Sequence, residues 1–297
     1  MPPAEIVTGT LPELEDALAD AIVRARKADP LAPVTAMVGH VLLKRYLPRM
    51  LAARGIAHLN VRFVRPNELA EALSPDAGAD RARLSPAAER LLIREVAASA
   101  GGYFATIAHG DGFTGALMRL FRELEMGGFD SPPALDRALR DADSDGNHEK
   151  FSELAKLYGR YRQRREIANL VGPAERYAAA EIARFEGPLL VYGLWAPSEL
   201  QSRLIERIAA ERPVSAFFAR SGLDADEAHA ALRERLIASG ATERAIDAPH
   251  DTTGPGRLAV ASGHERRRPV GRPDAHVEVA GRAGPAVVRL GHERQAP

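Results

Sequence analysis

The segment Thr8-Gly9-Thr10 has the residue types of a phosphate-binding loop, since it joins an apolar stretch directly to an amphipathic one. A complete loop needs glycines that turn successive N–H groups inward, a lysine for the terminal phosphates and a Ser or Thr for magnesium. This segment has one glycine and no lysine, and the acidic Glu13, Glu15 and Asp16 follow it. We interpret Thr8, Gly9 and Thr10 as a relic phosphate loop, in which Thr10 and Glu13 form the capping box of a helix.

A second apolar segment, 187–194, lacks the acidic residues that would complete an ATPase site. In such enzymes a strand ends in carboxylates that hold magnesium and orient water. Here Tyr192 and Gly193 end the strand, and a helix containing Gln201 follows. We therefore predict no catalytic residue, no bound cofactor and no metal ion. Trp195, just after the strand, either stacks on a ligand or packs at the edge of the core.

A basic stripe is the candidate contact with DNA. Lys156, Arg160 and Arg164 recur every four residues and so share one helix face, as phosphate contacts require. Tyr158 and Tyr161 would then be available to stack on bases. We favour the alternative in which apolar residues and Tyr161 form a core stripe with the cations as its solvated flank, because exposed charge is the default for Lys and Arg.

An acidic segment resembles a calcium-binding loop over some of its positions. Positions one, three, five and six of such a loop are matched by Asp141, Asp143, Asp145 and Gly146. Position twelve needs a bidentate acid but is Ser152, and Glu153 comes one residue late. An acidic linker between helices is the favoured interpretation, and a weak, incidental cation site is the alternative.

The composition sets the broad class. The chain has 297 residues, 45% hydrophobic and 27% charged, with a net charge of zero, which fits a soluble globular protein of about two domains without a global basic field. There are no cysteines, so disulfides and thiolate chemistry are excluded, and a reducing cytoplasm fits. No apolar run approaches the roughly 18 residues of a membrane span, and no signal peptide is readable. We expect a cytoplasmic protein that does not bind membranes.

The hydrophobic periodicity predicts an α/β fold, namely a P-loop NTPase-like parallel sheet with a large all-helical insertion and an irregular C-terminal tail. Strands are expected at 4–9, 33–39, 57–64, 187–194 and 212–219. Helices are expected between them, including one at 172–187 and one that Pro48 kinks or ends. The predicted order is a first α/β segment at 1–83, a helical insertion at 84–186, a second α/β segment at 187–241, and a tail at 242–297.

The tail is rich in Gly, Pro, Arg, Ala and His and shows no lasting period. It is either a disordered Arg-rich segment or GC-rich DNA read out of frame, and we favour the second. The basic segment 265–272 is a third option, a nucleic-acid-binding arm.

Four segments carry a family resemblance. Residues 34–73 and 191–209 keep the framework of superfamily 1 (UvrD-like) helicases without its acidic motif. Residues 103–129 and 150–165 are similar to the helical insertion of the AddB-type subunit of bacterial helicase–nucleases. Related proteins belong to the PD-(D/E)XK nuclease family. The resemblance covers about Glu5 to Ser239 and rests on the overall pattern.

This resemblance implies a non-catalytic helicase-like module that contacts DNA, or acts as a scaffold, in DNA repair and recombination beside a helicase partner subunit. The nuclease module of the family would follow the present chain, so neither nuclease nor ATPase activity is carried over to any residue here. Two alternatives stay open. One is a small α/β nucleotide-using enzyme with an atypical phosphate loop, and the other is a non-functional truncated product whose sheet lacks its last strands and keeps an open edge.

Overall fold

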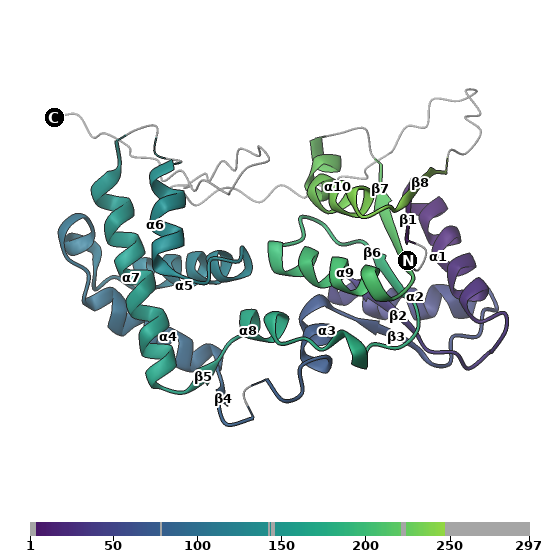
Figure 1. Ribbon diagram of the computed structural model, residues 1–297, viewed down its shortest axis with the longest axis horizontal. Helices are drawn as coiled ribbons and strands as arrows, with labels where there is room; N and C mark the ends of the chain where they lie inside the picture. The colour runs from purple at the N-terminus through teal and green to yellow at the C-terminus, as the bar shows by residue number, and fades with distance from the viewer. Residues whose placement is uncertain (1–3, 78, 142, 144–145, 221–223, 247–297) are drawn as a thin grey trace, which may run out of the picture. The chain divides into compact units, whose positions relative to one another are not determined.

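The computed structural model describes residues 4–77, 79–141, 143, 146–220 and 224–246 and has an α/β fold (Figure 1). A six-stranded sheet has the order β3-β2-β6-β7-β1-β8, and every neighbouring pair in it is parallel. Its strands are β1 (Ala4–Gly9), β2 (Val34–Val38), β3 (Val61–Val64), β6 (Leu189–Tyr192), β7 (Val214–Ala219) and β8 (Thr242–Ala245). A second, two-stranded parallel sheet pairs β4 (Ala82–Arg83) with β5 (Leu170–Val171).

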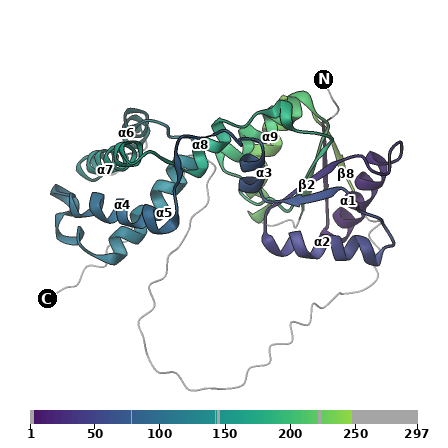
Figure 2. The same cartoon turned by 90° about the horizontal axis from the view of Figure 1, so that it is seen from below.

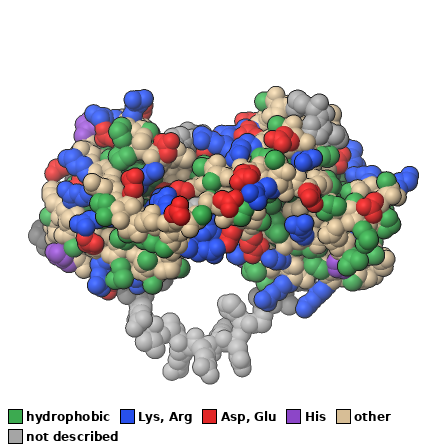
Figure 3. Space-filling model, turned by 60° about the horizontal axis from the view of Figure 1, so that its bottom comes forward, with side chains coloured by type: hydrophobic (Ala, Val, Ile, Leu, Met, Phe, Trp, Pro, Cys, Tyr) green, Lys and Arg blue, Asp and Glu red, His purple; other side chains and the backbone are tan. Residues whose placement is uncertain are grey.

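Helices make up most of the rest of the described chain. The α-helices are α1 (Leu11–Ala25), α2 (Val41–Ala53), α3 (Pro66–Ala72), α4 (Pro86–Ala98), α5 (Asp111–Met126), α6 (Pro132–Asp141), α7 (His148–Ile167), α8 (Pro173–Ala178), α9 (Glu199–Glu211) and α10 (Ala230–Ala238). Short 3-10 helices are η1 (Gly102–Ile107), η2 (Ile182–Arg184) and η3 (Asp224–His229). Acidic and basic side chains are interspersed on the face that Figure 3 shows.

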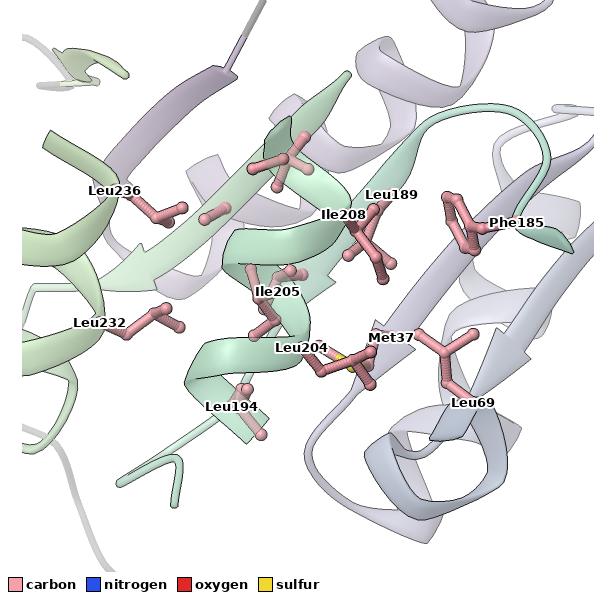
Figure 4. Close-up of a cluster of buried hydrophobic side chains, with 14 of the residues drawn as sticks. Met37, Leu69, Phe185, Leu189, Leu194, Leu204, Ile205, Ile208, Leu232 and Leu236 are labelled. Atoms are coloured by element: carbon pink, nitrogen blue, oxygen red, sulfur yellow. The ribbon is translucent and has the colours of Figure 1, made fainter. Parts of the chain in front are cut away.

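The sheet separates two hydrophobic cores. Successive side chains of a strand point to opposite faces, and Ile6 accordingly packs in one core while its neighbour Val7 packs in the other. Helices α1 and α2 cover the Val7 face, and α3 and α9 cover the Ile6 face (Figure 2). Helix α10 also packs on the Ile6 face. Figure 4 shows the core on the Ile6 face, in which α9 places Leu204, Ile205 and Ile208 against the strands.

All five predicted strands are confirmed, but three others were missed: the short β4 and β5, the latter inside the segment predicted as all-helical, and β8 of the main sheet. The sequence pattern assigns Thr242–Ala245 to the irregular tail, whereas these residues form β8 and pair with β1. All four are exposed and mostly polar, so no hydrophobic pattern marks them as a strand, and the pairing depends on the free edge of β1. The edge of the sheet next to β1 is therefore covered. The rest of the predicted tail, 247–297 with its basic segment 265–272, lies outside the described residues.

Of the two options for Pro48, that it ends its helix is wrong, because α2 continues through it. One other helix prediction was wrong in extent. The helix expected at 172–187 stops after Ala178, because tertiary contacts take the backbone groups that a longer helix would use. The Arg207 guanidinium donates to the carbonyl of Tyr177, and the N–H of Glu181 donates to Leu73 O at 2.7 Å.

The helices α4 to α7 share a core of their own, and a buried charge cluster lies at its border. Phe121, Tyr158 and Tyr161 are fully buried there. Arg165 of α7, itself 3% exposed, pairs with the carboxylates of Glu125 and Glu175. Burial raises the pKa of Glu125 to about 7, and this effect outweighs the opposing charge of Arg165. The cluster thus joins α5, α7 and α8 through one guanidinium.

We expect Arg165→Met to lower the free energy of unfolding by about 3–5 kcal/mol, because Glu125 would stay buried without its cation. An unpaired Glu125 has a folded-state pKa above the unfolded value, so the folded protein holds the Glu125 proton more tightly than the unfolded chain does. The stability gained from this proton is fully present below pH 4.5 and is lost as the pH rises through the folded pKa. The loss should therefore be smaller at pH 5 than at pH 8 in urea titrations.

Arg164→Met is the matched control. The Arg164–Glu95 pair, at 2.9 Å, has both side chains about half exposed, so its removal should cost less than about 1 kcal/mol. Equal losses for the two variants would contradict the assignment of Arg165 as the buried link.

Candidate functional site

The carboxyl ends of the six parallel strands lie along one edge of the sheet, where α/β proteins bind ligands at points of reversed connection. The chain leaves β1 through α1 on one face and leaves β7 through α10 on the other. It likewise leaves β2 through α2 and β6 through α9 on opposite faces. Two crevices are therefore expected at this edge, one between β1 and β7 and one between β2 and β6.

Thr8, Gly9 and Thr10, interpreted from the sequence as a relic phosphate loop, lie at the end of β1 where the first crevice is expected, and a side chain of the chain itself caps the helix that follows. The backbone N–H of Thr10 donates to Glu13 Oε2 at 2.8 Å, which confirms the glutamate half of the predicted capping box. Pro12, at the second position of α1, has no N–H to offer. The helix end therefore has fewer donors for phosphate than a phosphate loop provides, and the signal from Pro12 was readable in the sequence but missed.

The space around Gly9 is also limited. A Cβ at this position would lie 3.0 Å from Glu13 Oε2 and 3.1 Å from Ile246 O. The Gly9 carbonyl accepts from Arg220 N at 2.8 Å, and Thr8 O accepts from Ile246 N at 2.7 Å. The loop thus joins the ends of β7 and β8 by backbone hydrogen bonds.

The other two acids of the first turns of α1 bind α2. Glu15 Oε1 accepts from the Tyr46 hydroxyl at 2.9 Å, and Asp16 pairs with Arg54 at 2.6 Å. The hydrogen bond to Glu15 raises the pKa of Tyr46. These acids, interpreted from the sequence as repelling phosphate, hold two helices together on one face of the sheet.

The β2–β6 crevice is closed by close backbone contact. A Cβ at Gly39 would lie 2.1 Å from Gly193 O, and Gly193 itself has φ +61°. Tyr192, which stands where an ATPase strand would end in an acid, is 3% exposed with its ring centroid 6.2 Å from that of Phe217. Burial raises the pKa of Tyr192 to about 12, so it stays neutral at ordinary pH. The strand end is a packing contact in place of a carboxylate.

Trp195 follows in the same loop and packs against one aromatic neighbour, while stacking on a ligand stays a prediction. Its side chain is 49% exposed, and its ring meets His229 edge-on with centroids 6.0 Å apart. His229 is 7% exposed and stacks on Phe218 with centroids 4.5 Å apart. Burial lowers the pKa of His229, with Asp226 opposing and Arg233 reinforcing that shift. Trp195 is thus about half exposed and packs against one aromatic ring.

The three cations of the basic stripe on α7 have different surroundings. Lys156 is exposed. Arg160 Nη1 donates to Ser99 O at 2.8 Å, and Arg164 pairs with Glu95 of α4 as described above. Tyr158 and Tyr161 have no exposed surface, so the suggestion that they stack on bases is wrong. The core-stripe interpretation of Tyr161 is confirmed, and Tyr158, which that interpretation did not include, is buried as well. Phosphate contact by the three cations stays a prediction.

In the segment that resembles a calcium loop, the carboxylates of Asp143 and Glu153 bind partners within the chain. Asp143 Oδ1 accepts from Asn147 N at 2.8 Å, and Oδ2 of the same residue pairs with His148 at 3.0 Å. Glu153 accepts from Gly101 N at 2.6 Å. Asp145 lies outside the described residues. In the described stretches of the chain no cluster of three or more His, Cys, Asp or Glu side chains could hold a metal ion.

Replacement of Gly39 by Ala tests the closed crevice. Because the new methyl group would meet the Gly193 carbonyl at 2.1 Å, the two loops must separate, and we expect a loss of about 2–3 kcal/mol in unfolding free energy. Gly112→Ala in α5 meets nothing within 4 Å and should be neutral or stabilising by up to about 1 kcal/mol. Urea titrations that give both variants the same stability would contradict the close contact.

Trp195 is the single tryptophan of the sequence, so its fluorescence reports on this loop alone. We expect acidification to change the emission with a midpoint below pH 6.5, because the buried His229 takes up its proton later than an exposed imidazole. The unfolded chain binds that proton first, so the free energy of unfolding should fall as the pH drops below 6.5.

The transition in Trp195 emission should disappear in His229→Gln and persist in His109→Gln, whose side chain is exposed elsewhere on the chain. An unchanged transition in His229→Gln would show that another group titrates.

Among the described residues no helix has the length and apolar character to cross a membrane. A scan against protein-family models finds no match, and a search of curated proteins finds no significant relative.

Proposed function

We propose that this chain is a non-catalytic, helicase-like module that contacts DNA or acts as a scaffold in DNA repair, on a sheet derived from a P-loop NTPase fold. One observation carries the non-catalytic assignment: the Glu13 carboxylate holds the N–H of Thr10 at the place where a phosphate would bind. A nucleotide would have to displace this carboxylate and approach Glu15 and Asp16, with no lysine in the loop to offset them.

The arrangement of the strands supports the P-loop derivation. The strand before the relic loop, β1, and the strand that would supply acids, β6, lie in one parallel sheet with β7 between them. Their carboxyl ends therefore face the same edge, as metal-assisted phosphate chemistry requires. Tyr192 stands where a carboxylate would be needed to hold the metal ion. The missing carboxylate and the missing lysine of the loop therefore belong to the same edge of the sheet.

The proposed DNA contact is supported by the resemblance and by α7. Arg164 keeps 55% of its side chain exposed while it pairs with Glu95, and a guanidinium has five N–H donors, so it can contact a phosphate without losing that pair. The exposed Lys156 lies two turns away on the same helix. A helicase subunit is the proposed partner, because a module without ATPase chemistry depends on a motor supplied in trans.

We expect magnesium–ATP to leave the melting temperature of the full chain unchanged and to be hydrolysed at no measurable rate, with or without single-stranded DNA. A thermal shift assay and a phosphate-release assay measure the two quantities. ATP-dependent stabilisation accompanied by DNA-stimulated hydrolysis would overturn the non-catalytic assignment and favour a nucleotide-using enzyme.

For DNA, the test is the anisotropy of a labelled single-stranded oligonucleotide as a function of salt. The variant Lys156→Gln/Arg160→Gln/Arg164→Gln should bind at least about tenfold more weakly, and its salt slope should fall by about 2, since each phosphate contact contributes about 0.7. A matched variant replaces the exposed cations Lys27, Arg45 and Arg49 by Gln and should bind as the wild type does. Equal affinities of all three proteins would refute the stripe.

A further inference from the structure

Three arginines gather where the chain passes between the six-stranded sheet and the helices α4 to α7. They lie in a hollow of about 350 Å³ whose lining includes Glu71, Ser74, Arg81, Arg83, Val171 and Arg176. Arg81 and Arg83 belong to the segment that leads away from α3, and Arg176 belongs to α8, which follows β5 on the return. Residues from distant positions in the sequence thus form one surface.

The paired strands β4 and β5 hold the two passing segments together. Arg83 pairs in register with Val171, and Leu84 N donates to Val171 O at 2.9 Å. The Arg81 guanidinium reaches across and donates to Leu170 O at 2.5 Å. The positions of the arginines on the two segments are therefore coupled by backbone hydrogen bonds.

The charges of the hollow do not balance. Glu71 pairs with both Arg83 and Arg176, the latter at 3.0 Å. Among the described residues that line the hollow, three side chains are cationic and one is anionic, which leaves two positive charges. The nearby Asp76 does not offset them, since it pairs with Arg184 at 3.0 Å.

The guanidiniums also keep donors to spare. Each has five N–H groups in a planar fork that matches the oxygens of a phosphate. Arg176 is 14% exposed and held by Glu71, whereas the Arg83 side chain is 65% exposed and can turn toward a ligand. The volume is large enough for a phosphate group with its water, and the lining is mainly polar, which disfavours an apolar ligand.

We propose that this hollow is a phosphate-binding site in which Arg81, Arg83 and Arg176 hold one phosphate group. The group comes either from a free phosphate compound or from the backbone of a nucleic acid. The inference goes beyond the proposed function, because a free phosphate would occupy the hollow whether or not the chain contacts DNA. A bound phosphate would bridge the two segments that join the sheet to the helices.

The experiment uses the full chain and two double variants of equal charge. Arg81→Gln/Arg83→Gln removes two cations and leaves the Arg176–Glu71 pair, and Arg45→Gln/Arg49→Gln removes two exposed cations of α2. Binding of inorganic phosphate is measured by calorimetry and by ³¹P line width at constant ionic strength. Binding of a single-stranded oligonucleotide is measured by anisotropy. Circular dichroism and melting temperature establish that both variants fold.

We expect Arg81→Gln/Arg83→Gln to weaken phosphate binding at least about tenfold, since two charge-assisted contacts are lost, while the α2 variant stays within about twofold of wild type. The same loss with the oligonucleotide supports a backbone phosphate as the natural ligand, and a loss with inorganic phosphate alone supports a free phosphate compound. If wild type binds neither probe, or both variants weaken binding equally, the site is refuted. Phosphate binding without DNA binding would support this site and overturn the proposed DNA contact.

Discussion

Every strand in a parallel sheet must be reached by a connection that crosses one of its faces, and the rest of this structure depends on that constraint. The connections from β1 to β2 and from β2 to β3 place α1 and α2 on one face, and those from β6 to β7 and from β7 to β8 place α9 and α10 on the other. The same constraint brings the loops that contain Thr10, Gly39 and Trp195 to one edge. Both the cores and the candidate site follow from it.

At that edge, polar and backbone groups are engaged by contacts within the chain. Glu13 takes the N–H of Thr10, and Tyr192 fills a strand end with an aromatic ring. Gly39 and Gly193 let two loops meet backbone to backbone. Each of these contacts stabilises the fold and reduces the space or the donors that a nucleotide needs. The parallel sheet and its connections are therefore held at this edge by packing within the chain.

Outside the sheet, pairing within the chain also decides where charge remains available. The zero net charge hides local imbalance, because carboxylates and guanidiniums do not meet one to one: Glu125 and Glu175 both pair with Arg165. Where one carboxylate meets several guanidiniums, as Glu71 does, positive charge is left over. That surplus lies on the connection between the sheet and the helices. It is therefore a candidate phosphate site that is separate from the proposed DNA contact on α7.

The sequence by itself determined the features that depend on neighbours along the chain. Alternation and apolar runs identified five strands, and Thr10 with Glu13 marked a helix start because capping involves residues three positions apart. The tertiary structure alone decided what depends on distant partners: the pairing of β8 with β1, the early end of α8, the contact of Gly39 with Gly193 and the gathering of Arg81 with Arg176. Local periodicity contains no information about which distant segment will supply a hydrogen bond, a charge or a steric limit, and those interactions form only when the chain has folded.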